Sequence, residues 1–550
     1  MAEPYTASAP QPGQRTQVRL EQAGLRHVPA AHPWPALAQV FGRPGTAEAR
    51  RGLLVFLVLM VAALVLRASA FLPSVINPDE SLYAVQAQAW LRGGWPYVAV
   101  WDMHPVGAPA LFMAAFTVFG ENLASLRLLG VLAVAGTGFA LNCAVRASGV
   151  GRATGLAAGL AYVACSALLD GLATNAEILL APFVAAGVAL GLRAMRRALR
   201  LGEAPGLGRV LLAGLLVGLA LLVKTVVLPL GCLVFLLLVV PALWVHALRW
   251  RRVAGLALAY ALACGAPLGL VALVYALRGE WAAFLDGNVL APLRYLGMGV
   301  PLAQAMRLSV AAGATLLLPV LLACGVLLPN RSACRPMRQA ELCLARAALA
   351  WLCAASLAVA LPGMYFPHYF LLLLAPVSLL AALGARRLAR LARPGLMLAG
   401  FAGLLAVTTL QAWSMVLLPR LEHGIGLKVQ DPPQRVAAAL NAGLRPGETI
   451  FVVNWQPLLY FLTNTVAPTR YVLPTQLTGH FARVTGIDPE AELARILATR
   501  PRFLVLDSGR WGQVAPAAQA MVTQVLEQDY EQYAQLPGED GSTVELWRLR

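Results

Sequence analysis

Long apolar runs alternate with short polar segments over most of the chain. We identify eleven runs that can cross a bilayer as helices, for which about 20 consecutive apolar residues suffice. They are residues 52–71, 124–145, 153–170, 177–194, 209–224, 226–245, 253–277, 308–328, 343–361, 368–385 and 395–418. The pattern predicts an α-helical polytopic membrane protein with about eleven transmembrane helices, in which residues 52–418 form the membrane core.

The segment 72–123, which follows the first apolar run, contains two shorter amphipathic patterns. The first helix is expected to begin at Pro78, with Asn77 as its N-cap and Glu80 completing a capping box. Its apolar and polar residues fall on separate faces, which is typical of a helix lying on a bilayer surface. A second amphipathic stretch, 105–119, follows a Gly-Gly break. We therefore expect two juxtamembrane helices in this loop.

Residues 419–550 return to the composition of a globular domain. Runs rich in β-branched and aromatic residues predict strands at 449–455, 502–509 and 542–549, and helical periodicity predicts helices at 431–443, 488–499 and 515–528. The alternation indicates a small α/β domain. It contains no Gly-rich phosphate loop and no catalytic triad signature, so we assign it no chemistry, and an acceptor-binding or lid role stays open.

Composition supports the membrane assignment. The 550 residues are 59% hydrophobic and 13% charged, whereas soluble domains are about 45–50% apolar and about 25% charged. Residues 1–51 are rich in Pro, Gly, Gln and Ala, which is typical of a disordered tail, and we expect no cleavable signal peptide.

The arginine distribution predicts the orientation. If the N-terminus is cytoplasmic, the inner segments hold 24 basic residues, and the opposite loops hold few. Positively charged loops stay inside, so the N-terminus is expected to be cytoplasmic and, with an odd number of helices, residues 419–550 extracytoplasmic. The net charge of +17 then reflects inner loops that face anionic lipid, and no nucleic-acid partner is needed to explain it.

The eight cysteines fall in apolar runs or inner loops, and residues 419–550 have none. No disulfide framework or paired-cysteine metal site is implied. The glycosylation sequon at residues 330–332 lies in a predicted inner loop, and we interpret it as a chance match.

Potentially reactive side chains gather at the opposite, outer face, which an extracytoplasmic active site would require. The candidate residues are Asp79, Glu80, Asp102, His104, Glu177, Lys224, Arg294, Tyr295, His368 and Tyr369. Asp286 and Asn288 lie in the same outer loop as Arg294.

Each candidate also has a purely structural interpretation. Helix capping accounts for Glu80 but leaves Asp79 without a structural task. Lys224 is one of only two lysines beside 41 arginines; it either snorkels to the interface or binds a phosphate as a compact point charge, and we favour the second. Asp102 with His104 is either a solvated loop pair or part of the site, and His368 is either interfacial or part of the site.

The order of these motifs resembles the GT-C glycosyltransferases of the bacterial family 39/83 group, which is similar to protein O-mannosyltransferases and to lipid A aminoarabinose transferases. The resemblance rests on Asn-Pro-Asp-Glu at 77–80, Trp-Asp-Met-His-Pro at 101–105, the helix-opening Glu177, Lys224 at the end of an apolar run, and Phe-Pro-His-Tyr at 366–369.

The resemblance implies a helical core with two juxtamembrane helices, and transfer of a sugar, with inversion, from a polyprenyl-phosphate carrier to an extracytoplasmic acceptor. It implies that Asp79, with Glu80 beside it, supplies the catalytic base and that Glu177 is the second acidic position. Lys224 with His104 or His368 would hold the donor phosphate. His104 departs from the aminoarabinose transferases, which have a lysine at that position, and this puts aminoarabinose as the donor sugar in doubt.

The expected partners are a polyprenyl-phosphate sugar, membrane lipid, and an acceptor that is lipid A, another glycan or a protein. The expected location is the bacterial inner membrane. A divalent metal is conceivable, but no ligand spacing supports one. Two other functions stay open: a secondary transporter that uses Asp79, Glu177 and Lys224 as an ion relay, and a non-catalytic lipid-glycan assembly protein.

Overall fold

The computed structural model describes residues 46–327, 337–389, 394–422, 426, 429–538 and 541–550. Gly52–Arg550 forms one compact unit, and the contacts discussed below lie within it. Most of the tail predicted for residues 1–51, and the sequon at 330–332, lie outside the described residues.

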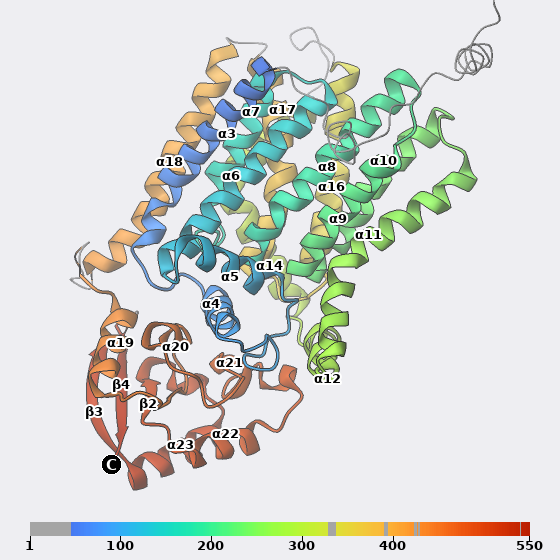
Figure 1. Cartoon of the computed structure of the whole chain (residues 1–550). Coiled ribbons are helices and arrows are strands. Elements are labelled where there is room, and N and C mark those ends of the chain that lie inside the picture. Colours follow the sequence, from blue (N-terminus) through green and yellow to red (C-terminus); the bar gives the residue numbers. More distant parts are fainter. Residues whose placement is uncertain (1–45, 328–336, 390–393, 423–425, 427–428, 539–540) are drawn as a thin grey trace, which may run out of the picture. The chain divides into compact units, whose positions relative to one another are not determined.

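All eleven predicted transmembrane runs coincide with helices (Figure 1). Among the described residues, eight helices are long and apolar enough to span a membrane. These helices, with η1, η2 and η5 as short 3-10 extensions of α3, α10 and α17, are α3 (Thr46–Arg67), α6 (Leu123–Ser148), α8 (Ala176–Leu201), α10 (Leu228–Trp244), α11 (Trp250–Leu277), α16 (Gln339–Ala360), α17 (Leu374–Ala389) and α18 (Pro394–Glu422).

The other three predicted runs are less regular. The run 308–328 forms two helices, α14 (Leu302–Thr315) and α15 (Leu317–Cys324), and this pair is bent by 78°. The helix α9 (Leu207–Val223) has 17 residues and α7 (Arg152–Cys165) has 14, so both are shorter than a usual span. The chain is a multi-pass membrane protein, and the odd number of crossings stays a prediction.

The segment 72–122 between α3 and α6 contains the two expected juxtamembrane helices, α4 (Pro78–Leu91) and α5 (Gly107–Phe119). α4 does not present a polar face to water, as a helix exposed on the bilayer surface would, because every residue from Glu80 to Gln88 is buried. The short helix α20 (Leu458–Thr463) packs against it, and Gln88 donates hydrogen bonds to Glu121 and to the carbonyl oxygen of Phe461. Its polar face therefore meets protein and not water.

The C-terminal region has the predicted α/β character. Its four strands are β1 (Ile450–Val452), β2 (Phe503–Asp507), β3 (Tyr530–Pro537) and β4 (Thr543–Leu549), in the order β1-β2-β4-β3. β1 and β2 are parallel, with Ile450 opposite Phe503, and the other two pairs are antiparallel. The helices α19 (Pro432–Gly443) and α23 (Pro516–Asp529) pack against β3 (Figure 1).

The sequence did not predict β3, because it mixes polar and apolar residues without alternation and buries only Tyr530, as suits an edge strand. The remaining short helices are α12 (Trp281–Leu285), α13 (Ala291–Leu296), α21 (Pro474–Leu477) and α22 (Pro489–Ala498), with a π-helical turn at Asp286–Leu290.

Candidate active site

The first turn of α4 presents two adjacent carboxylates in different environments. Asn77 caps the helix, since its side chain accepts a hydrogen bond from the backbone NH of Asp79 at 2.9 Å. The side chain of Asp79 is 34% exposed, whereas that of Glu80 is 2% exposed. Asp79 is thus accessible to a substrate and Glu80 is not.

Glu80 is held by buried partners on several segments. Arg127 donates to both of its carboxylate oxygens at 2.5 Å, and the backbone NH groups of Ile76 and Thr174 donate at 3.2 and 2.9 Å. The predicted capping box is therefore displaced by one residue, because Glu80 bonds to Ile76 and not to Asn77. These contacts favour a positioning role for Glu80 over the predicted catalytic one.

A second buried arginine fixes the turn that precedes α8. Arg67 donates hydrogen bonds to the carbonyl oxygens of Gly171, Leu172 and Ala173 at 2.5, 2.7 and 3.2 Å. A Cβ atom at Gly130 would lie 2.8 Å from both Arg67 and the Thr174 hydroxyl, so this position needs glycine. Arg67 and Arg127 were not among the predicted site residues, and their positions near the ends of apolar runs are the only sequence signal that could have found them.

This framework sets the start of α8 and hence Glu177. The ammonium of Lys224, directly after the last residue of α9, lies 2.6 Å from Glu177 Oε1. Lys224 also lies 4.2 Å from the ring centroid of Tyr369, a cation–π contact. The second carboxylate oxygen of Glu177 is buried and has no hydrogen-bond partner among the described residues. The ammonium keeps donors beyond the one used by Glu177.

The segment that opens with Pro367 connects this ion pair to Asp79. His368 Nε2 lies 3.8 Å from Asp79 Oδ2, which is beyond hydrogen-bond distance. The hydroxyl of the adjacent Tyr369 lies 3.2 Å from that of Tyr295. These contacts thus link six of the predicted site residues: Asp79, His368, Tyr369, Tyr295, Lys224 and Glu177.

Asp102 and His104 form a further pair. The Nδ1 atom of His104 lies 3.1 and 3.2 Å from the two carboxylate oxygens of Asp102. Burial lowers the pKa of His104, but the charge and hydrogen bond of Asp102 outweigh this effect and leave the pKa above its ordinary value of 6.5. The charges of Lys224 and Asp79 also act on this pKa, so His104 lies within their electrostatic range.

Tyr83, one turn after Asp79, was not among the predicted site residues. Burial raises its pKa well above the usual value, and the charges of Asp79, Asp102 and Glu177 raise it further. Its ring lies edge-on to that of His104, with centroids 6.4 Å apart. Tyr83 therefore contacts His104 and lies within electrostatic range of Asp79 and Glu177.

Arg294 has different surroundings from the other candidates. It lies 2.6 Å from Asp286, and it donates hydrogen bonds to the carbonyl oxygens of Val484 and Thr485 in the C-terminal region. Asn288 donates to the carbonyl oxygen of Phe284. The contacts of Arg294 favour a role in joining the segment between α11 and α14 to the C-terminal region over its predicted place in the site.

The cluster thus offers one accessible carboxylate, an ammonium and two imidazoles. Such a set can accept a proton and stabilise an anion. In the part of the chain that the structure describes, no group of three or more His, Cys, Asp and Glu side chains could hold a metal ion.

No protein-family model matches the sequence, and no curated protein matches it either. Several solved structures match the chain. ArnT from Cupriavidus metallidurans bound to undecaprenyl phosphate matches with a TM-score of 0.56 and 14% identity, over 90% of this chain and 97% of that one. The apo state of the same protein matches with a TM-score of 0.57 and 15% identity, over 90% and 98%. The chain therefore has the GT-C fold of the glycosyltransferases that its motifs resemble.

Proposed function

We propose that this protein is an inverting glycosyltransferase that moves a sugar from a polyprenyl-phosphate carrier to an extracytoplasmic acceptor. The observation that carries the proposal is the pairing of a partly exposed carboxylate, Asp79, with the buried ammonium of Lys224 in one connected cluster. ArnT, which shares the fold, was crystallised with undecaprenyl phosphate, and we extend that ligand class to this chain.

In the proposed reaction, Asp79 takes the proton of an acceptor hydroxyl as its oxygen attacks the anomeric carbon of the donor. The new carbon–oxygen bond forms while the bond from the anomeric carbon to the phosphate oxygen breaks, so the polyprenyl phosphate leaves as an anion. A general base contributes about 10²–10⁴-fold to such a step. Attack from the face opposite the phosphate inverts the anomeric centre.

The leaving phosphate needs positive charge that is already in place. Lys224 would supply it, since only one of its donors is used by Glu177. His104 would add a second cation, because its raised pKa favours the imidazolium. Glu177 would orient Lys224, and Glu80 with Arg127 would position both Asp79 and the start of α8.

The positions of the charged groups favour transfer over ion transport. Glu177 is the second residue of α8, and Lys224 follows the last residue of α9. Transporters place their ion sites near the bilayer midplane, on interrupted helices. We accordingly propose a location in the bacterial inner membrane, with the N-terminus cytoplasmic and the cluster on the outer face.

Mass spectrometry of envelope glycolipids, glycans and glycoproteins from cells with and without the gene tests the proposal. We expect one hexose, pentose or aminosugar substituent to disappear when the gene is deleted and to return with the wild-type gene. An unchanged envelope, with polyprenyl-phosphate sugars at wild-type levels, would contradict it.

A further inference from the structure

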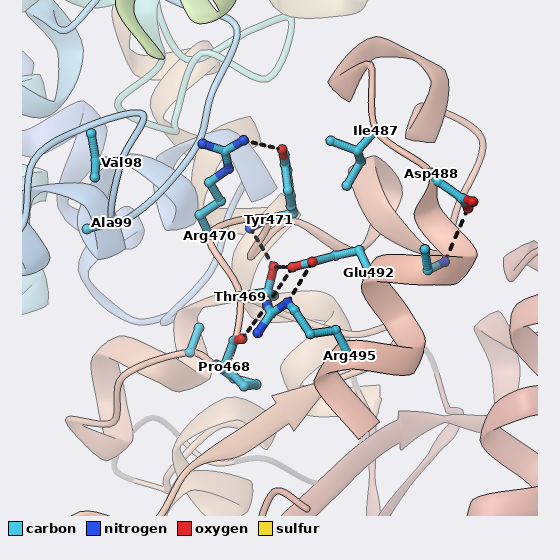
Figure 2. Close-up of a pocket in the computed structure, with 12 residues that line it drawn as sticks. Val98, Ala99, Pro468, Thr469, Arg470, Tyr471, Ile487, Asp488, Glu492 and Arg495 are labelled. Atoms are coloured by element: carbon cyan, nitrogen blue, oxygen red, sulfur yellow. Dashed lines mark hydrogen bonds and ion pairs between the residues drawn. The ribbon is translucent and has the colours of Figure 1, made fainter. Parts of the chain in front are cut away.

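A cavity of about 680 Å³ lies apart from the Asp79 cluster, and none of the predicted site residues lines it. It is bordered by Val98 and Ala99 of the first outer loop, by residues 467–471, and by the first turns of α22 (Figure 2). Its size falls within the range of about 300–1,000 Å³ that small-ligand sites occupy. No lining residue belongs to a helix that is long and apolar enough to span a membrane, among those described.

The charged side chains at the cavity differ in how many of their ion pairs and hydrogen bonds are made within the protein. Glu492 pairs with Arg495 at 2.7 Å and accepts a hydrogen bond from the Thr469 hydroxyl at 2.6 Å. Asp488 caps α22. Arg470 donates to the Tyr471 hydroxyl at 2.8 Å and, in the described part of the chain, has no carboxylate within ion-pair distance. Most of its five donors are therefore free for a ligand.

Unpaired arginine at a cavity favours an anionic group. The guanidinium fork matches the geometry of carboxylate and phosphate, which it binds through two parallel hydrogen bonds. The apolar residues Val98, Ala99 and Ile487 line the same space as the acidic residues Asp488 and Glu492 (Figure 2). A saccharide presents both apolar CH faces and hydroxyl donors, so it complements such a mixed wall.

The cavity is in direct contact with the segment that leads to the cluster. The backbone NH of Trp101 donates to the carbonyl oxygen of Arg470 at 2.8 Å, and the rings of Trp101 and Tyr471 lie 5.5 Å apart. The next residue, Asp102, pairs with His104. A ligand in the cavity therefore lies against the chain segment that carries part of the site.

We propose that this cavity binds the saccharide portion of the acceptor and that this saccharide carries a phosphate or a carboxylate. The inference rests on the proposed function and specifies the chemistry of its acceptor. The donor is held by its phosphate near Lys224 and by its tail in lipid. The cavity lies outside the spanning helices, so a molecule that reaches both places must extend outward from the membrane, as an acceptor glycan does.

Binding of three probes to the full chain in nanodiscs tests this directly, by ligand-observed NMR. We expect glucose 1-phosphate to bind saturably, and glucose and inorganic phosphate to bind at least tenfold more weakly. Arg470→Gln should weaken binding of glucose 1-phosphate by about tenfold, because charge-assisted hydrogen bonds are lost. Ala491→Trp should abolish it by filling the cavity, and Ala99→Trp does so from the opposite wall.

Matched variants locate the site. Arg483→Gln removes an exposed arginine that does not line the cavity, and Ala494→Trp adds the same bulk elsewhere on α22; both should leave binding unchanged. Binding that survives Arg470→Gln overturns the proposal, as does inorganic phosphate binding as tightly as the sugar phosphate, or no saturable binding.

The two proposals fail separately. If glucose 1-phosphate binds as expected but no sugar transfer is found, the glycosyltransferase is refuted and the saccharide site remains. If transfer occurs but Arg470→Gln binds the probe as the wild type does, the site is refuted and the enzyme remains.

Discussion

Lys224 Nζ lies 2.6 Å from Glu177 Oε1, and the two side chains are 6% and 1% exposed. This pair joins the end of α9 to the start of α8. Removing one partner of a buried ion pair costs about 3–5 kcal/mol, because the other charge is left uncompensated, whereas replacing both by apolar residues is often neutral. The pair therefore allows the contribution of Lys224 to stability to be separated from its contribution to donor binding.

Lys224→Met alone should lower the free energy of unfolding by about 3–5 kcal/mol and weaken donor use at least tenfold. The double variant Lys224→Met, Glu177→Leu should regain most of the stability but none of the donor use. Thermal unfolding in detergent and the KM for the donor check the two parts. A wild-type KM for the donor in the double variant would show that Lys224 has only a structural role.

Substitution of Glu80 should lower the stability of the protein, whereas substitution of Asp79 should leave it unchanged. Glu80→Gln leaves the buried guanidinium of Arg127 without its counter-charge, so we expect a loss of stability of several kcal/mol. Asp79→Asn changes a partly exposed group whose nearest basic atom, His368 Nε2, is 3.8 Å away, so its unfolding temperature should match that of the wild type. If Glu80→Gln unfolds at the wild-type temperature, the ion pair between Glu80 and Arg127 does not stabilise the site.

Donor affinity should depend on pH through His104. Its pKa is raised, so the imidazolium is present below the ordinary value of 6.5 and is lost as the pH rises through the raised value. Affinity for a polyprenyl-phosphoryl hexose, whose phosphodiester does not titrate in this range, should therefore fall between neutral and alkaline pH. The His104→Gln variant should bind the donor more weakly, and its affinity should not fall over this pH range. If the variant and the wild type have identical pH profiles, His104 does not bind the donor.

Labelling with a membrane-impermeant maleimide tests the orientation. Arg483→Cys, at an exposed position of the C-terminal region, should react in intact spheroplasts. Arg200→Cys, at the exposed end of α8 that is predicted to be cytoplasmic, should react only after permeabilisation. The reverse pattern would place the cluster on the cytosolic side and contradict the proposed function.

Local sequence signals predicted much of this fold. Apolar runs predicted the helices, because a segment that crosses lipid must satisfy its backbone hydrogen bonds internally. Asn77 and Pro78 predicted the start of α4, because they are typical N-cap and first-turn residues. The bend between α14 and α15 was missed, because an unbroken apolar run contains no signal for a 78° change of direction.

The sequence identified candidate site residues where a charged residue stands next to an apolar run, as Asp79 and Lys224 do. The sequence could not show which of them meet. Arg127 and Arg67 were not among the predicted site residues, yet they hold Glu80 and the turn before α8. Arg294 was counted among the candidate site residues because it lies in a predicted outer loop, but its partners come from residues 190 and 191 positions later in the chain. Such long-range pairing leaves no local pattern.

The most direct measurement of the central claim is sugar transfer by purified wild-type protein and by Asp79→Asn in nanodiscs, with the donor and acceptor identified by envelope mass spectrometry. Asp79→Asn should fold as the wild type does and still bind undecaprenyl phosphate. Its transfer rate should fall by at least 100-fold, since a general base contributes about 10²–10⁴-fold. Transfer by this variant within a few fold of the wild-type rate would contradict the role of Asp79 as the base.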